Sequence, residues 1–271
     1  MQAKKSLGQN LLKSKSAINK IILSSDLNKD DVVLEIGPGE GILTEQILKI
    51  VKKVFVVEKD DRLIPFLKEK FDKEIKEEKL EIIHGDILEE NLNFLPKKYK
   101  LVANIPYYIT GQIIRKFLEN PPAETQPSLI TLLVQKEVAE RIVARPARRG
   151  GGDKKESLLS ISVKVYGDPK IEGAVPRGSF SPIPKVDSAI ISIKNISKNN
   201  FSEIKEKDFF EVLHAGFAHK RKQLIPNLSN LFEREGLLET FKDLKINTKA
   251  RAEEISTENW LKIVEQKNTQ D

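Results

Sequence analysis

Short apolar runs alternate with amphipathic stretches along the first half of the chain. Residues 32–36, 54–57, 80–83 and 99–103 are apolar runs short enough for buried strands, whereas residues 14–25 and 42–51 have helical spacing. Strands that alternate with helices predict a mostly parallel sheet of the doubly wound α/β class. Residues 157–166 and 186–194 are predicted to be the last two strands, with an antiparallel edge.

The pattern changes after the polar segment 195–200. Apolar residues then recur at helical spacing over residues 208–221, 226–234 and 258–266, and Trp260 is expected in the core. We therefore predict two domains, residues 1–196 with the sheet and residues 197–271 with a small all-helical fold.

Composition sets the class of protein. The chain has 271 residues, 39% of them hydrophobic, which suffices for an α/β core and a small second domain. It has no cysteine, no membrane-length apolar stretch and no signal-peptide pattern, so we expect a cytoplasmic protein. Its three histidines lack ligand spacing, so no metal site is expected.

A glycine loop, Gly37-Pro38-Gly39-Glu40-Gly41, follows the first apolar run. A pyrophosphate needs free N–H groups at an uncluttered helix start, and this loop carries a proline and an acid. It suits a ligand with a cationic or zwitterionic edge, such as S-adenosylmethionine. The alternative is a glycine-rich turn that binds nothing.

Acidic residues follow the next two predicted strands. Glu58 lies about twenty residues past the glycines, where a carboxylate can accept from both ribose hydroxyls. Asp86 follows Gly85 and can accept from the adenine amine. Each alone could be an ordinary loop residue, but ligands bind where the carboxyl ends of parallel strands meet, so together they predict one cofactor site.

The fourth run ends in Asn104-Ile105-Pro106-Tyr107. Pro106 fixes its own φ and keeps Ile105 extended, so the corner is stiff. The Asn104 amide oxygen and a neighbouring carbonyl could accept from one exocyclic –NH2 group, and Tyr107 offers a flat face to its ring. This corner predicts chemistry on the amine of a base.

Together these segments resemble the rRNA adenine N6,N6-dimethyltransferase family, which includes the kasugamycin- and erythromycin-resistance methyltransferases. The matching segments are residues 5–12 (with Leu11 where phenylalanine is usual), 34–41, 104–108 and 180–189. The resemblance implies a Rossmann-like S-adenosylmethionine-dependent methyltransferase sheet with a small all-helical C-terminal domain.

The resemblance also implies roles for residues. Tyr107 and Phe180 are expected to sandwich the target adenine, with Asn104 at the reacting amine. Cofactor contacts are expected from the N-terminal segment, the glycine loop and the strand ends: Gln9, Asn10, Leu12, Gly37, Gly39, Glu58, Asp86 and Asn104.

Within the family, residues 180–189 and 217–224 match the small-subunit branch better. That branch implies dimethylation of two adjacent adenosines near the 3′ end of small-subunit rRNA, on the immature small ribosomal subunit, by a monomer. The segment 145–156 departs from the family pattern. A large-subunit rRNA methyltransferase and a non-catalytic assembly factor stay open as alternatives, and adenine-N6 DNA methylation is a weaker third.

Basic residues are clustered, although the net charge is only +6. Residues 1–20 hold five lysines and no acid, and residues 141–155 are again basic. We expect phosphate contacts from Arg148 and Arg149 and from the triplet Lys220, Arg221 and Lys222 in the helical domain.

Overall fold

The structure is a computed structural model that describes residues 10–119, 121, 125–146 and 155–268. Its chain forms two compact units. The first contains residues 1–139 and 168–196, and the second contains residues 140–167 and 197–271. The chain thus passes between units at residues 196–197, where we placed the domain boundary. Residues 140–167, which we placed in the first domain, are part of the second unit.

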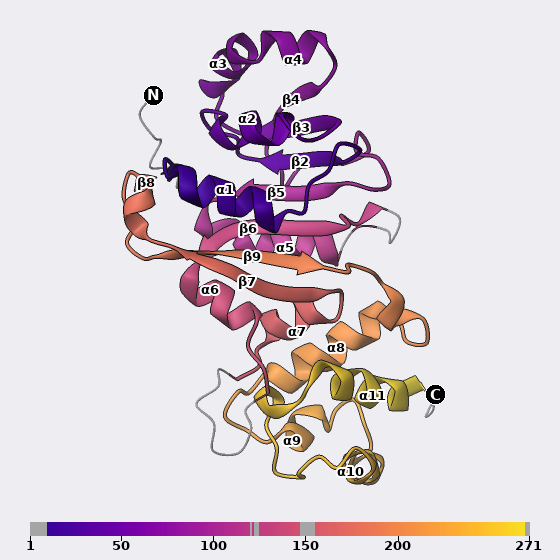
Figure 1. The fold of residues 1–271 in the computed structure, drawn as a ribbon. Helices are drawn as coiled ribbons and strands as arrows, with labels where there is room; N and C mark the ends of the chain where they lie inside the picture. The colour runs from indigo at the N-terminus through magenta and orange to yellow at the C-terminus, as the bar shows by residue number, and fades with distance from the viewer. Residues whose placement is uncertain (1–9, 120, 122–124, 147–154, 269–271) are drawn as a thin grey trace. The chain divides into compact units, whose positions relative to one another are not determined.

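A mixed sheet forms the centre of the first unit (Figure 1). The described residues build it from seven strands in the order β4-β3-β2-β5-β6-β9-β7. Neighbouring strands from β4 to β6 are parallel, and β9 is antiparallel to both β6 and β7. The predicted α/β sheet with an antiparallel edge is confirmed. The strands are β2 (Val32–Ile36), β3 (Lys53–Glu58), β4 (Leu80–His84), β5 (Lys100–Asn104), β6 (Leu129–Gln135), β7 (Asp168–Val175) and β9 (Ser188–Lys194).

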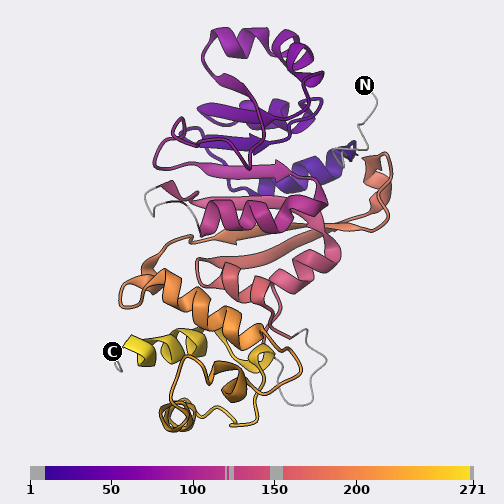
Figure 2. The ribbon, with the colours of Figure 1, turned by 180° about the vertical axis from the view of Figure 1, so that it is seen from behind.

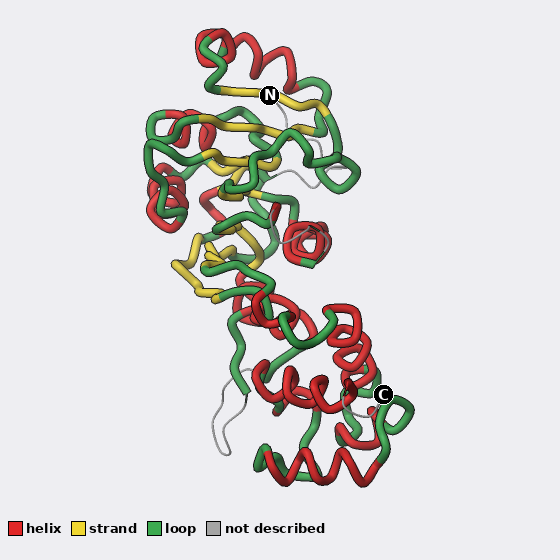
Figure 3. The backbone as a smooth tube through the Cα atoms, turned by 90° about the vertical axis from the view of Figure 1, so that its right-hand side faces the viewer, coloured by secondary structure: helices red, strands yellow, loops and turns green. Residues whose placement is uncertain are grey.

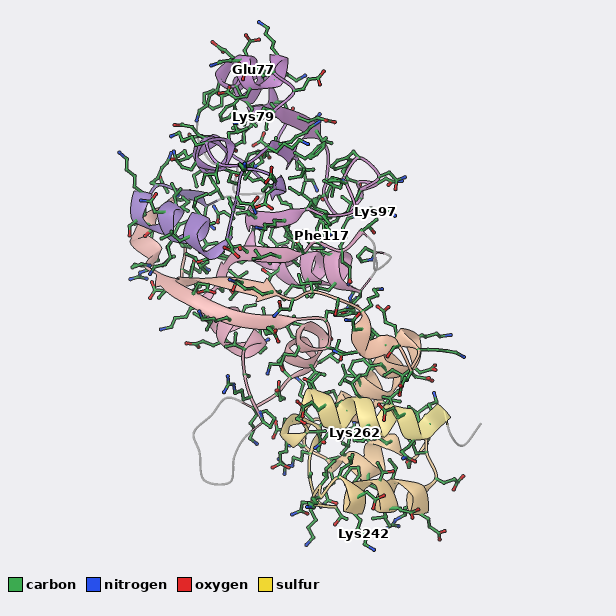
Figure 4. The ribbon with its side chains drawn as sticks, turned by 45° about the vertical axis from the view of Figure 1, so that its right-hand side comes forward. Glu77, Lys79, Lys97, Phe117, Lys242 and Lys262 are labelled. Carbon is green, nitrogen blue, oxygen red and sulfur yellow. The ribbon has the colours of Figure 1, made fainter. Side chains whose placement is uncertain are left out.

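Helices cover both faces of this sheet. Helix α1 (Lys15–Ser24) lies on one face and α5 (Thr110–Leu118) on the other, as opposite views show (Figures 1 and 2). Phe117 of α5 is fully buried (Figure 4). The remaining helices before β7 are α2 (Ile42–Leu48), α3 (Leu63–Lys70), α4 (Asp72–Lys76), η2 (Tyr107–Ile109), α6 (Lys136–Ile142) and α7 (Leu158–Lys164). Because the faces are covered, a central strand such as β6 is buried along nearly its whole length.

A short two-stranded ribbon adjoins the sheet. Strand β1 (Leu11–Leu12) pairs antiparallel with β8 (Phe180–Ser181), just after the turn η4 (Arg177–Ser179). Leu12 faces Phe180 in this pairing, and the Lys13 N–H donates to the Ser179 carbonyl at 2.8 Å. The pairing brings the N-terminal segment beside the motif at residues 180–189.

The predicted strand at residues 157–166 is wrong, because residues 158–164 form helix α7. The Ser157 hydroxyl accepts from the Ser160 N–H at 3.2 Å, and the Ser160 hydroxyl accepts from the Ser157 N–H at 2.7 Å. This capping box satisfies two N–H groups at the start of the helix. Strand β7 follows instead, at a position that we did not predict.

The second unit contains helices and no strand among its described residues (Figure 3). Trp260 is fully buried, as predicted. Lys242 of α10 and Lys262 of α11 are exposed to solvent (both are labelled in Figure 4). The elements after β9 are η5 (Asn199–Phe201), α8 (Glu206–Phe217), α9 (Leu224–Leu228), α10 (Arg234–Asp243), η6 (Ala252–Glu254) and α11 (Thr257–Asn268). The three predicted helices are present with shifted ends, and α10 was not predicted.

Candidate active site

A cavity of about 210 Å³ lies where the carboxyl ends of β2, β3, β4 and β5 meet. Ile36, Val57, Ile87 and Ile105 contribute apolar walls. The cavity brings together most of the residues predicted to bind a cofactor, namely Asn10, Gly37, Gly39, Glu58, Asp86 and Asn104. The parallel topology is the cause, because it turns every one of these strand ends toward the same edge.

The glycine loop forms one wall of the cavity. Gly39 has a φ of +60°, a conformation that L side chains rarely adopt. A Cβ at Gly39 would lie 3.1 Å from the Leu11 side chain, a tight contact that this side chain would have to relieve by shifting slightly. The Gly39 N–H donates to the Glu58 carboxylate at 3.2 Å. The loop is therefore fixed to the end of β3.

Glu58 is a buried carboxyl group, 4% exposed. Its second oxygen accepts from the Asp60 N–H at 2.8 Å. Burial raises the pKa of Glu58, and the two backbone N–H groups oppose that shift. A buried acceptor held by the backbone in a cavity wall is suited to hydroxyl groups of a ligand.

Asp86 is held by an ion pair that the sequence did not reveal. Its carboxylate accepts from Lys59 at 2.6 Å and from the Leu88 N–H at 3.0 Å. Partial burial acts to raise the pKa of Asp86, but these donors outweigh it and the net shift is downward. Lys59 also lines the cavity. The sequence could have indicated this role of Lys59, because Lys59 directly follows Glu58, which was already predicted at the same edge of the sheet.

The Asn104 amide lies at the junction of the N-terminal segment and the catalytic corner. Its Nδ2 donates to the Asn10 carbonyl at 3.1 Å. Pro106 has φ −57° and ψ 133°, and its carbonyl accepts from the Ile109 N–H at 3.2 Å. The bond to Asn10 fixes the side-chain amide and leaves its oxygen as the acceptor.

The two predicted base-stacking residues are held by contacts within the protein in this structure. The Tyr107 hydroxyl is hydrogen bonded to the Ser188 hydroxyl at 2.6 Å, and partial burial raises the pKa of Tyr107. Phe180 is 3% exposed and packs in a hydrophobic cluster that includes Leu12. Neither is among the residues that line the cavity, so the adenine sandwich stays a prediction.

Leu12 and the acid Glu35 line a second, smaller hollow of about 40 Å³ at the glycine loop. Glu35 is 1% exposed, and its Oε2 has no hydrogen-bond partner among the described residues. Burial raises the pKa of Glu35 to about 8, and the Glu58 carboxylate acts in the same direction. The sequence placed Glu35 before the glycines but did not reveal a buried carboxyl group with one oxygen left without a partner among the described residues.

The predicted RNA-contacting triplet lies in the second unit. Lys220, Arg221 and Lys222 are exposed in the turn between α8 and α9. None of them forms a salt bridge with any carboxylate that the structure describes. Gln9, Arg148 and Arg149 lie outside the described residues.

Within the described ranges, no three His, Cys, Asp or Glu side chains are grouped so that they could hold a metal ion. Over the same residues, every helix is too short or too polar to cross a membrane.

Comparison with known proteins identifies the family. The family model for ribosomal RNA adenine dimethylase matches residues 1–269. The chain belongs to this family. It is similar to ribosomal RNA small subunit methyltransferase A of Dehalococcoides mccartyi, at 40% identity over 96% of this chain and 87% of that protein. The enzyme of the same name from Fusobacterium nucleatum is 38% identical, over 96% of both chains.

Solved structures of similar proteins have the same fold. The 23S rRNA methyltransferase ErmE has a TM-score of 0.75 and 25% identity, over 96% of this chain and all of that one. A dimethyladenosine transferase from Plasmodium falciparum has a TM-score of 0.76 and 28% identity, over 93% of this chain and 95% of that one. The predicted methyltransferase fold and the predicted rRNA adenine dimethyltransferase activity are confirmed.

The cavity fits S-adenosylmethionine, the methyl donor of this family. The buried Glu58 carboxylate offers acceptors for the ribose hydroxyls, and Asp86 offers one for the adenine amine. The glycine loop has no side chain at Gly39 that would obstruct the cavity. The carboxylate of Glu40, in the adjoining hollow, suits a ligand with an ammonium and a sulfonium group.

Proposed function

We propose that this chain dimethylates N6 of two adjacent adenosines in a loop near the 3′ end of small-subunit rRNA. The immature small ribosomal subunit is its substrate, in the cytoplasm, and the enzyme acts as a monomer. The observation that carries the proposal is the Asn104 corner, which opens on the same cavity as Glu58 and Asp86. The small-subunit names of the relatives support the choice of rRNA.

Each cavity residue has a role in this proposal. Glu58 accepts from the ribose hydroxyls and Asp86 from the cofactor's adenine amine, while Gly37 and Gly39 contact its amino-acid end. Asn10 contacts the cofactor and also holds Asn104 through the 3.1 Å hydrogen bond. Gln9 and Leu12 complete the cofactor site.

S-adenosylmethionine, when bound, supplies an electrophilic methyl group on a sulfonium. The chain's own residues must place the target amine for in-line attack. The N6 lone pair is delocalised into the purine ring. The Asn104 oxygen and the Ile105 or Pro106 carbonyl accept from the two N6 protons, which favours a pyramidal amine and stabilises its developing positive charge. Since the proton can leave after attack, the proposal needs no dedicated general base.

The target base must leave its stack to reach this corner. RNA loops allow this at lower cost than duplexes. Tyr107 and Phe180 then hold the ring between them. For Phe180 this requires the β1–β8 region to open, because the ring is buried in the present structure.

The substrate is tested with labelled S-adenosylmethionine on naked rRNA, isolated small subunits and isolated large subunits, followed by nucleoside mapping. We expect N6,N6-dimethyladenosine at adjacent positions of small-subunit rRNA. Label on large-subunit rRNA, or no methyl transfer to any substrate, would contradict the proposal.

The catalytic corner is tested by Asn104→Ala. Deleting one preorganised hydrogen-bonding group should lower turnover about 10²–10³-fold at saturating S-adenosylmethionine, with the fold and RNA binding retained. Saturation matters because Asn104 also faces the cofactor cavity. Turnover within a few-fold of wild type would remove Asn104 from the mechanism while leaving the family assignment intact.

A further inference from the structure

The two tyrosines of η2 take different environments. A 3₁₀ turn has three residues per turn, so successive side chains point about 120° apart. Tyr107 reaches Ser188 at the start of β9, and Ile109 is buried. Tyr108 is 65% exposed and lines the cavity. The two neighbouring tyrosines therefore serve different sides of the corner.

The strand order shows which side Tyr108 serves. Strand β5, which leads into η2, has β6 and β9 on one side and β2, β3 and β4 on the other. Tyr107 is hydrogen bonded to Ser188, at the start of β9 and within the motif at residues 180–189. Tyr108 shares the cavity wall with Lys59, after β3, and Asp86, after β4.

The ion pair between Lys59 and Asp86 marks that end of the cavity. The Asp86 carboxylate raises the pKa of Lys59, and the Tyr108 phenol adds a smaller effect in the same direction. Ile87 and Ile109 line the same cavity, which gives it apolar surface for a flat ring.

We propose that Tyr108 is a further cofactor-binding residue, whose ring covers the adenine of S-adenosylmethionine at the mouth of the cavity. The proposal rests on the proposed function, which places the adenine amine at Asp86. It divides the tyrosine pair between the two substrates: Tyr107 serves the target base and Tyr108 the cofactor. A large exposed aromatic side chain beside a cavity has little reason to be there for packing, whereas a purine offers it a matching face.

Calorimetric titration with S-adenosylhomocysteine tests the contact, using Tyr108→Ala and Tyr108→Phe. Tyr108→Ala loses stacking on a base, so its affinity for S-adenosylhomocysteine should be about 5- to 100-fold weaker than that of wild type. Tyr108→Phe keeps the ring, so its affinity should stay within about twofold of wild type. Phe66→Ala is the matched control, because Phe66 is an exposed aromatic residue that does not line the cavity. It should leave binding unchanged.

A second ligand locates the contact on the cofactor. 5′-Methylthioadenosine keeps the adenine and ribose but lacks the amino-acid end, so Tyr108→Ala should weaken its binding by the same factor. Unchanged affinity of Tyr108→Ala for S-adenosylhomocysteine would overturn the proposal, and weaker rRNA binding by that variant would then assign Tyr108 to the RNA. A Tyr108→Phe variant as weak as Tyr108→Ala would also overturn it.

Glu58→Ala separates this failure from failure of the proposed cofactor site. If Glu58→Ala weakens S-adenosylhomocysteine binding and Tyr108→Ala does not, the site stands and the adenine contact is wrong. If neither variant changes the affinity, the proposed cofactor site itself is wrong.

Discussion

Glu58 combines two tasks at the residue scale, since it holds the Gly39 and Asp60 N–H groups and faces the cofactor cavity. Glu58→Ala should weaken S-adenosylmethionine binding by about 1.5–3 kcal/mol, the cost of losing a hydrogen bond to a charged group. Calorimetry measures the change, with Glu58→Gln as a variant that keeps an acceptor oxygen. Unchanged affinity of the alanine variant would remove Glu58 from the site.

Glu35 should make stability depend on pH. Its pKa in the folded protein is about 8, against 4.5 for the free group, so the folded state keeps a proton that the unfolded state loses. The free energy of unfolding contributed by this group therefore falls as pH rises from 4.5 to 8, and is constant above and below that window.

Glu35→Gln removes the titration while keeping a similar shape. The free energy of unfolding of the variant minus that of wild type should therefore be larger at pH 8 than at pH 5. The increase should be at least about 1.4 kcal/mol, the equivalent of one pKa unit. Urea denaturation at the two pH values measures this. An equal difference between the proteins at both pH values would show that Glu35 ionises normally in the folded state.

At the scale of elements, Lys164 at the end of α7 joins two chain segments of the second unit. Its ammonium donates to the Ala144 carbonyl and lies 2.7 Å from the Glu156 carboxylate. The Glu156 side chain is almost fully buried, and it also accepts from the Ser160 hydroxyl. One lysine thus ties α7 to Ala144, just before the segment 145–156, and to Glu156 at its end.

Lys164→Met should destabilise the protein by about 3 kcal/mol, because it leaves a buried carboxylate without its cation. Denaturation measures the loss. The double variant Lys164→Met/Glu156→Gln should be more stable than Lys164→Met alone, since it removes the charge left unpaired. A single variant as stable as wild type would show that the pair contributes nothing.

Charge distribution matters at the scale of the whole molecule. Replacing Lys220, Arg221 and Lys222 by glutamine should weaken rRNA binding and reduce the slope of log affinity against log salt by about 0.7–0.9 for each lost phosphate contact. Cofactor affinity should not change. Filter binding over a range of salt concentrations gives the slope.

A second triple variant with the same net charge tests whether the position of the lost charges matters, or only their number. Lys242, Lys245 and Lys249 are exposed residues of the same unit, and their replacement by glutamine also removes three positive charges. This variant should keep the wild-type slope. Equal slopes in both triple variants would show that the triplet makes no specific phosphate contacts.

Much of the fold and of the site was determined by the sequence alone. Residues 32–36 formed a strand with the predicted ends, because a short β-branched run followed by glycines has few other ways to be buried. Glu58, Asp86 and Asn104 were placed at one edge because strands that alternate with helices are parallel, and parallel strands end at the same edge.

Tertiary structure decided what local pattern leaves open. The apolar run at residues 157–166 suits a buried strand or a helix by periodicity, and it forms α7, which belongs to the second unit and is no strand of the sheet. Periodicity cannot show that Glu35 is buried with its Oε2 atom unpartnered among the described residues, since that depends on which elements cover it. The two tyrosines after Pro106 look equivalent in the sequence. Their separation between Ser188 and the cavity follows from the turn of η2 and from the strands on either side of β5.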